Sequence, residues 1–154
     1  MVRLVDALHH GVDIGYRGNR AAGRRARNSP TTEDVRVAAL ISEAIAVDVA
    51  AGHKRGPFAE PPFEPFHVSP LSGVPKGENG ESIRVIHNLS HPFSGDSINA
   101  GIEREPYAMQ RLEDALAGVR RLGRGCLMTK FDVRAAFKLV PVRPEDYALL
   151  GLCW

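Results

Sequence analysis

The chain has 154 residues, of which 44% are hydrophobic and 25% charged, and its formal net charge is +2 with neutral histidines. This predicts one soluble globular domain or part of a larger one, able to bury a core without disulfides or a structural metal. A run of about 18 apolar residues is absent, which excludes a transmembrane helix, and the N-terminus lacks a secretory signal pattern. Cys126 and Cys153 lie in apolar strings and are expected to be reduced packing residues of an intracellular protein, with no distinction between nucleus and cytoplasm.

Residues 1–28 hold the basic excess of the chain. Six arginines and two aspartates within residues 1–30 give this end a charge of +4 and leave −2 for the remainder. Large apolar residues are too few here to offset the entropy of ordering, so we expect a flexible basic arm. Such an arm either contacts nucleic-acid phosphates or is only a solubilising tail. The candidates for phosphate contact are Arg17, Arg20, Arg24, Arg25 and Arg27.

Residues 29–66 are predicted to form a helix followed by a proline-rich connector. The helix is expected over 31–52, with Ser29 or Thr31 as its N-cap and Gly52 at its end. An apolar stripe would pack on a sheet or another helix while the charged positions stay in water. The stripe consists of Val37, Ile41, Ala44, Ile45 and Val49. The charged positions expected to be exposed to solvent are Arg36, Glu43 and Asp48. Four prolines in residues 53–65 predict an extended connector.

Residues 66–89 show the pattern of a β-hairpin whose turn is the GENG segment at 77–80. Because strand side chains alternate, one face of the second arm is expected to hold Ile83, Val85 and His87, and the other Arg84, Ile86 and Asn88. Lys76 and Arg84 stand on facing arms, where they could clamp a polyanion or lie in solvent as ordinary surface cations.

The remaining residues are predicted to alternate between loops, one helix and short strands. A loop at 90–106 precedes an amphipathic helix over 107–123, whose apolar residues are Met109, Leu112, Leu116 and Val119. Strands are expected at 126–132, 139–142 and 148–154, with turns at 133–138 and 144–147. His87 and His91 have the spacing of a helical zinc pair, but Pro92 and the strand-to-loop pattern argue against one.

Asp132 ends the predicted strand at 126–132 and precedes a tight turn. A carboxylate in this position is where α/β folds place metal ligands. It could equally cap the following turn, and the local pattern leaves both interpretations open. Phe137, five residues later, is by default a core aromatic.

Three sequence blocks carry a resemblance to a known family. SIRVIHNLSHPF at 82–93, KFDVRAAFKLVPV at 130–142 and PEDYALLGLCW at 144–154 resemble, in this order, the reverse transcriptase family. The resemblance is closest to the polymerases of tyrosine-recombinase-type (DIRS-like) retrotransposons and covers roughly residues 69–154. It implies an incomplete α+β fold, with a fingers hairpin, helices, and the first strand and helix of a palm. The implied divisions are an arm at 1–28, a helix and connector at 29–66, and fingers with a partial palm at 67–154.

The resemblance also implies a nucleotide site. Asp132 would be the first catalytic carboxylate of the palm and would hold one or both of two Mg²⁺ ions, with a backbone carbonyl of Val133 or Phe131 completing the coordination. Lys76 and Arg84 would hold the incoming deoxynucleoside triphosphate. Phe137 would lie under the sugar and exclude a ribose 2′-hydroxyl. The implied partners are an RNA or DNA template–primer, dNTPs, and downstream palm, thumb and RNase H or recombinase domains of the same polyprotein, with no membrane.

The sequence departs from the family at two points. Asn88 stands where the family usually has Asp, and no paired-aspartate motif occurs in the 22 residues after Asp132. One carboxylate cannot hold two Mg²⁺ ions in catalytic geometry, so we expect a fragment of a retroelement polymerase that is inactive alone. The alternatives are a non-catalytic nucleic-acid-binding remnant or domesticated module, and a related palm polymerase with another biological role.

Overall fold

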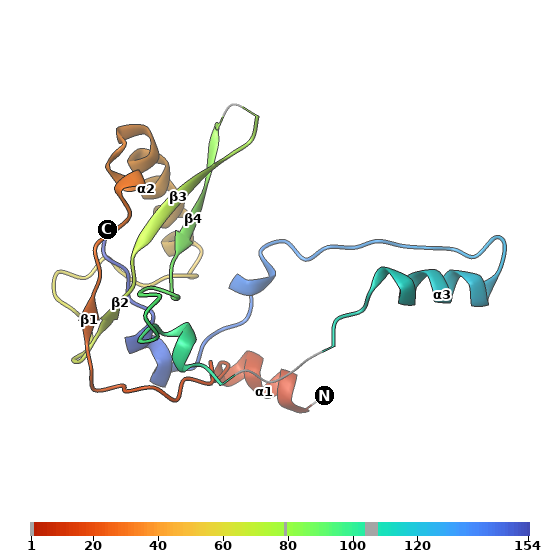
Figure 1. Cartoon of the computed structure of the whole chain (residues 1–154), viewed down its shortest axis with the longest axis horizontal. Coiled ribbons are helices and arrows are strands. Elements are labelled where there is room, and N and C mark those ends of the chain that lie inside the picture. The colour runs from red at the N-terminus through yellow and green to blue at the C-terminus, as the bar shows by residue number, and fades with distance from the viewer. Residues whose placement is uncertain (1, 79, 104–107) are drawn as a thin grey trace.

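The computed structural model describes residues 2–78, 80–103 and 108–154 and contains both helices and strands (Figure 1), so the predicted mixed α+β class is confirmed. The α-helices are α1 (Val2–His10), α2 (Val35–Ala50) and α3 (Leu112–Leu122). The strands are β1 (Arg24–Arg25), β2 (His67–Val68), β3 (Leu71–Lys76) and β4 (Ser82–His87). Short 3-10 helices are η1 (Pro30–Glu33), η2 (Asn99–Gly101), η3 (Ala136–Lys138) and η4 (Pro144–Leu149). Over these described ranges, no helix has the length and apolar character needed to cross a membrane.

Helix α2 confirms the helix expected after Pro30, although it begins later than expected. Ser29 caps the 3-10 helix η1 instead, where its hydroxyl accepts a hydrogen bond from the Thr31 N–H. Asp34 is the N-cap of α2, and its carboxylate accepts a 2.9 Å hydrogen bond from the Val37 N–H. The helix packs against β3 and β4, and Ile41, at the centre of the predicted stripe, is fully buried.

Strands β3 and β4 form the predicted antiparallel hairpin, paired from Leu71 with His87 to Lys76 with Ser82. The expected alternation along β4 is confirmed, because Ile83, Val85 and His87 are half-buried while Arg84 is exposed. Asn79, in the predicted turn, lies outside the described residues.

The flexible arm expected at 1–28 is not what the structure shows, because Val2–His10 form α1 and residues 11–28 pack against distant parts of the chain. Strand β1 pairs in parallel with β2, and single bridges join Val12 to Val142 and Tyr16 to Ile102. The buried cluster consists of Tyr16, Ile98 and Leu149, flanked by Ile14, Leu89, Ile102 and Leu150. Composition suggested an arm because this segment has few large apolar residues of its own. Segments more than 70 residues away supply its apolar partners.

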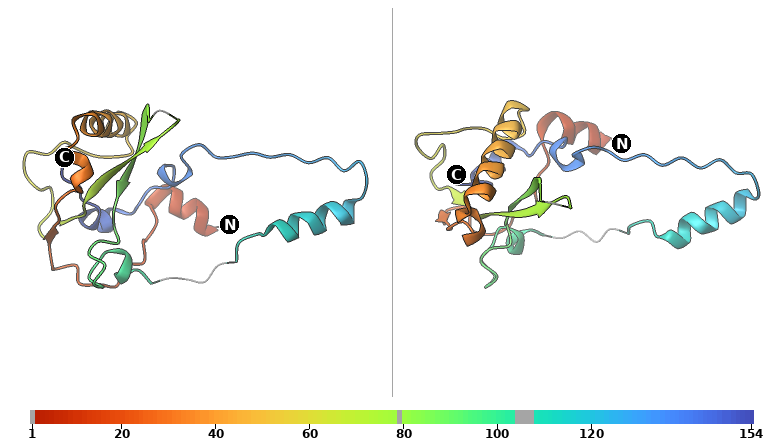
Figure 2. Two further views of the ribbon diagram at one scale, coloured as in Figure 1. Left: turned by 45° about the horizontal axis from the view of Figure 1, so that its top comes forward. Right: turned by 90° about the horizontal axis from the view of Figure 1, so that it is seen from above.

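The predicted strand at 126–132 is absent, and this part of the prediction is wrong. Figure 2 shows α3 and the chain after it extending away from the rest of the described residues. Leu127 and Phe131 are 97% and 84% exposed. A strand requires a neighbouring strand to pair its N–H and C=O groups, and no described strand lies beside this segment.

Two other expectations for this half of the chain need correction. The strands expected at 139–142 and 148–154 are reduced to the single bridges at Val142 and Gly151. The predicted turn at Pro144 instead begins the 3-10 helix η4, because proline fits the first position of a helix. The helix expected over 107–123 is present as α3, but Leu112 and Leu116 are exposed, and Tyr107 lies outside the described residues.

Gly151 is expected to be intolerant of a side chain. A Cβ there would lie 2.6 Å from the His67 carbonyl oxygen and 2.5 Å from the Phe66 ring. We predict that Gly151→Ala lowers the free energy of unfolding by about 1–3 kcal/mol through overpacking, measured by urea denaturation. Gly118→Ala in α3 is the matched control, because a Cβ there meets nothing within 4 Å. Equal effects of the two substitutions would contradict the prediction.

Candidate functional site

The hairpin presents the two predicted triphosphate-binding cations on one exposed face. Arg84 pairs with Val74 in the β3–β4 register, and Lys76 pairs with Ser82. Directly opposed residues share a face, so Lys76 and Arg84 are diagonal neighbours on the same face. Gly73 belongs to the other face, where an added Cβ would meet Val37 and Ile41 of α2. The cations therefore lie on the side of the hairpin away from α2, and both are exposed.

The predicted palm residues lie in the extended part of the chain. Asp132 is exposed, and Val133 and Phe137 are 51% and 99% exposed. Phe137 lies in η3, and Asp132 precedes it in a segment without regular structure. In the ranges 2–78, 80–103 and 108–154, no hydrogen bond or ion pair joins Asp132 to Lys76 or Arg84. No group of three or more His, Cys, Asp or Glu residues that could hold a metal ion occurs there either.

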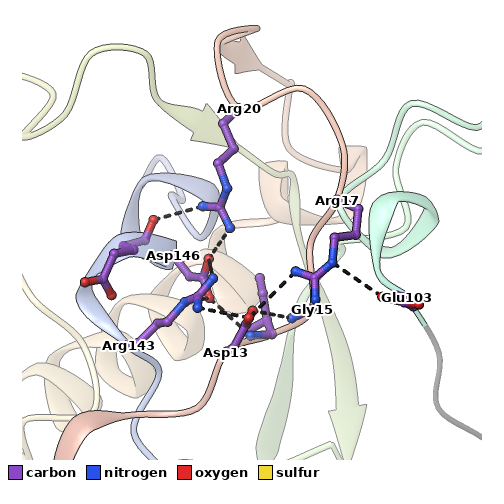
Figure 3. Close-up of polar contacts among 9 residues, drawn as sticks. Asp13, Gly15, Arg17, Arg20, Glu103, Arg143 and Asp146 are labelled. Carbon is purple, nitrogen blue, oxygen red and sulfur yellow. Dashed lines mark hydrogen bonds and ion pairs between the residues drawn. The ribbon is translucent and has the colours of Figure 1, made fainter.

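Arg20 is paired with a buried carboxylate (Figure 3). Asp146 is fully buried and accepts hydrogen bonds from Arg20 at 2.5 Å, from Arg143 at 2.9 Å and from the Ile14 N–H at 3.1 Å. Burial raises the pKa of Asp146, but these hydrogen bonds lower it more, and the net pKa lies below the ordinary value. Arg20 also donates to the Glu145 carbonyl at 2.9 Å.

A second acidic residue extends this network to Arg17. Asp13 lies 2.9 Å from Arg143 and 3.7 Å from Arg17, and Arg17 lies 3.4 Å from Glu103. We call these six charged side chains the Asp146 cluster; its members are Asp13, Arg17, Arg20, Glu103, Arg143 and Asp146. Two of the five arginines proposed for nucleic-acid contact are therefore already paired with acids.

The other three of the five candidate arginines are on the surface. Arg24 donates to the Asp96 carbonyl at 3.4 Å, and Arg25 lies 2.9 Å from the Cys153 sulfur. Arg27 is exposed. Among the described residues, these three guanidinium groups have no acidic partner, so their charge is not already neutralised by an acid of the chain.

Two histidines are held largely neutral by burial. The Nε2 of His87 lies 3.0 Å from the Gly151 carbonyl oxygen, to which it donates. Burial lowers the pKa of His87 more than this hydrogen bond raises it, and Lys54 lowers it further. Burial and the charge of Arg24 likewise lower the pKa of His67. His67 lines a cavity of about 370 Å³ together with Tyr16, Arg24 and Asp96.

The sequence analysis did not identify two buried carboxylates, Asp48 and Asp146. For Asp48, the helical spacing already indicated a buried position. Asp48 was expected in water but is 7% exposed. It stands seven residues after Ile41, which is the spacing of one helix face, so the helical period already placed it on the buried side. Asp146 lies in a polar segment that was predicted as a turn and forms η4, and its partner Arg20 is 126 residues away in the sequence, so no local pattern could identify the pair.

Comparisons with protein-family models, with curated proteins and with solved structures return no match. The function is therefore argued from the residues and their geometry.

Among the charged residues of the fold, Asp146 is expected to be the one whose substitution lowers stability most. We predict that Asp146→Asn lowers the free energy of unfolding by about 1–3 kcal/mol, because Arg20 and Arg143 lose their charged hydrogen-bond acceptor, while Arg143 keeps its ion pair with Asp13. Glu145→Gln, at an exposed neighbouring position, is the control and is expected to change it by less than about 0.5 kcal/mol. Urea denaturation of both variants measures the difference, and an Asp146→Asn effect as small as the control would contradict it.

The histidines predict a loss of stability in mild acid. The pKa values of His67 and His87 in the folded protein lie below the ordinary 6.5, so between the two values the unfolded chain binds more protons. The stability that the two neutral histidines contribute is fully present above about pH 6.5. It is lost as the pH falls toward their pKa values in the folded protein. Urea midpoints measured from about pH 7.5 down to about pH 5 should decrease, and less so in His87→Gln. A midpoint that rises over this range would contradict the assignment.

Proposed function

We propose that this chain is the fingers and the opening part of the palm of an RNA-directed DNA polymerase from a retroelement. The observation that carries the proposal is the pair Lys76 and Arg84 on the open face of the hairpin. These are the two residues to which the resemblance assigns the incoming triphosphate, and sequence alone left them open to interpretation as ordinary surface cations.

The face that carries the two cations suits a polyanionic ligand. Its other strand positions are occupied by Ser72, Val74, Ser82 and Ile86, so neither cation has an acidic strand neighbour there. A guanidinium offers a forked pair of donors to phosphate oxygens, and an ammonium offers a compact positive charge. A deoxynucleoside triphosphate supplies the matching oxygens, and Phe137 would select against the ribose 2′-hydroxyl.

The described residues do not fit a two-Mg²⁺ site. Asp132 is exposed and belongs to no group of metal-ligating side chains in the described ranges. Clustered carboxylates on rigid elements are needed to hold two ions. We therefore propose that the chain alone binds dNTPs without polymerising them, and that nucleotidyl transfer belongs to a longer protein that supplies further carboxylates.

A non-catalytic nucleic-acid-binding module is the alternative. It would use Arg24, Arg25 and Arg27 together with the hairpin cations, since Arg17 and Arg20 are engaged with Asp13, Glu103 and Asp146. Its affinity for DNA or RNA would fall steeply with salt and would not depend on Mg²⁺ or Asp132.

Binding of a magnesium–dNTP complex to the full chain tests the proposal. Because each exposed cation contributes up to about 1 kcal/mol, Lys76→Ala and Arg84→Ala should each weaken binding up to about fivefold, and more in combination. Arg120→Ala with Arg121→Ala, in exposed positions on α3, is the matched control and should bind as the wild type does. Isothermal titration calorimetry measures the wild type and the four variants.

Two outcomes would contradict this assignment. Equal dNTP affinity in the hairpin variants and the α3 control would remove Lys76 and Arg84 from the site. Salt-dependent binding of single-stranded DNA without any competition by dNTP would favour the non-catalytic module instead.

The catalytic part of the proposal has its own test in the transcript. Sequencing in frame beyond the Trp154 codon is expected to reveal an apolar strand with adjacent aspartates. A stop codon directly after Trp154 would exclude catalysis for this product.

A further inference from the structure

Helix α3 has an apolar face that no other described helix or strand covers. Leu112, Leu116 and Leu122 are 70%, 46% and 68% exposed. Within the described ranges α3 contacts no other helix or strand, and Figure 2 shows it at the far end of the protruding chain in both views. A helix of 11 residues is only marginally stable in water, and helices gain most of their stability by packing an apolar face. The face therefore needs a partner.

The apolar residues of α3 have the spacing of a helix that packs against another helix. Leu112, Leu116 and Val119 follow one another at steps of four and three residues, so they form one narrow line along the helix, which we call the α3 stripe. Ala115 and Leu122 are seven residues apart and border the stripe on one side. Side chains at these spacings fit between those of a second helix with the same pattern.

The other border of the stripe carries one acid and one base. Glu113 follows Leu112 directly and Arg120 follows Val119, so the two charges lie on the same side of the stripe, two turns apart. Glu113 belongs to the first turn of α3 and Arg120 to the last. Both are exposed, and in the part of the chain that the structure describes neither forms an ion pair.

A second copy of α3, packed antiparallel about a two-fold axis, complements this border. In such a pair each border meets the same border of the other copy, in the reverse order. Glu113 then lies beside Arg120 of the second copy, and Arg120 lies beside the second copy's Glu113. The same register brings Leu116 against Val119 of the second copy, and the small Ala115 against the large Leu122. Charge, apolar contact and side-chain size therefore favour the same arrangement.

We propose that two copies of this chain associate through an antiparallel pair of α3 helices. A pair of three-turn helices is smaller than the roughly 1,000 Å² of a stable interface, so the dimer is weak, with a dissociation constant on the order of 0.1 mM. The proposal is independent of nucleotide binding, because Lys76, Arg84 and Asp132 lie outside α3.

Sedimentation equilibrium of the full chain between about 10 µM and 1 mM tests the proposal. The wild type should pass from monomer toward dimer over this range. Glu113→Arg leaves two bases on the border and Arg120→Glu leaves two acids, so each variant should raise its own dissociation constant about tenfold. Leu116→Glu should abolish association, and because Leu116 is exposed in the single chain, the unfolding midpoint of the monomer should stay unchanged.

A mixture of the two charge variants tests the antiparallel register itself. In a mixed pair, both bases of the Glu113→Arg copy face the two acids of the Arg120→Glu copy, so the mixture should associate about as tightly as the wild type. Arg121→Glu is the matched control, because it makes the same charge change in the same helix turn but on the side away from the stripe. It should self-associate as the wild type does, and its mixture with Glu113→Arg should stay weaker.

Three results would overturn the proposal. A wild type that is monomeric at about 1 mM would remove the dimer. Equal weakening by Arg120→Glu and Arg121→Glu, or a mixture of the two charge variants that does not recover association, would exclude the antiparallel pairing. Binding of a monomeric chain to phosphatidylserine vesicles, weakened equally by both arginine variants, would assign the apolar face to a membrane surface instead.

Discussion

The buried carboxylate of Asp146 is the interaction on which the described body of the protein depends. A fully buried charge is tolerated only when it is paired, so Arg20, Arg143 and the Ile14 N–H must all stay in place around it. This requirement holds the chain near residue 14 against the chain near residue 146. It brings Tyr16 and Leu149 into one apolar cluster. The chain then continues to Gly151, whose carbonyl accepts hydrogen bonds from the Ser69 N–H and from His87. The constraint thereby extends to the end of the hairpin.

The elements predicted correctly from sequence are those whose signals lie within their own residues. Helix α2 contains its apolar stripe, and its capping acid directly precedes it. The hairpin has a turn segment between two alternating strands of equal length, and its register follows from that turn. The segment at 126–132 also has strand-forming residues, but a strand exists only when a neighbour pairs its backbone groups. Since no described strand lies beside it, the same local pattern gives an extended, exposed chain.

Charge was harder to predict than hydrophobicity, because the partners of charged groups are remote. Counting arginines near the N-terminus indicated an open basic arm, yet the acids that pair with Arg17 and Arg20 include Glu103 and Asp146. Asp48 is different, since its spacing from Ile41 was visible in the sequence. Its charge made it an expected surface residue, but two lysines make its burial possible. The shared face of Lys76 and Arg84 was predictable, because the hairpin register fixes which face each residue occupies.

The two ionic links of the protein differ in how firmly they hold. Asp146 is fully buried and its partner Arg20 is 39% exposed, so dissolved salt screens this pair in part, and the pair acts together with the packing of Tyr16 and Leu149. The Lys138 side chain is 47% exposed, so salt screens its pair with Asp48 more strongly, and Phe137 beside it is 99% exposed and adds little packing. In the proposed nucleotide site, the triphosphate cations are thus fixed by a packed hairpin and helix. The residue that would sense the sugar is held mainly through one partly screened ion pair. The hairpin cations and Phe137 therefore have separate physical supports in this chain, and the support of Phe137 is the weaker of the two.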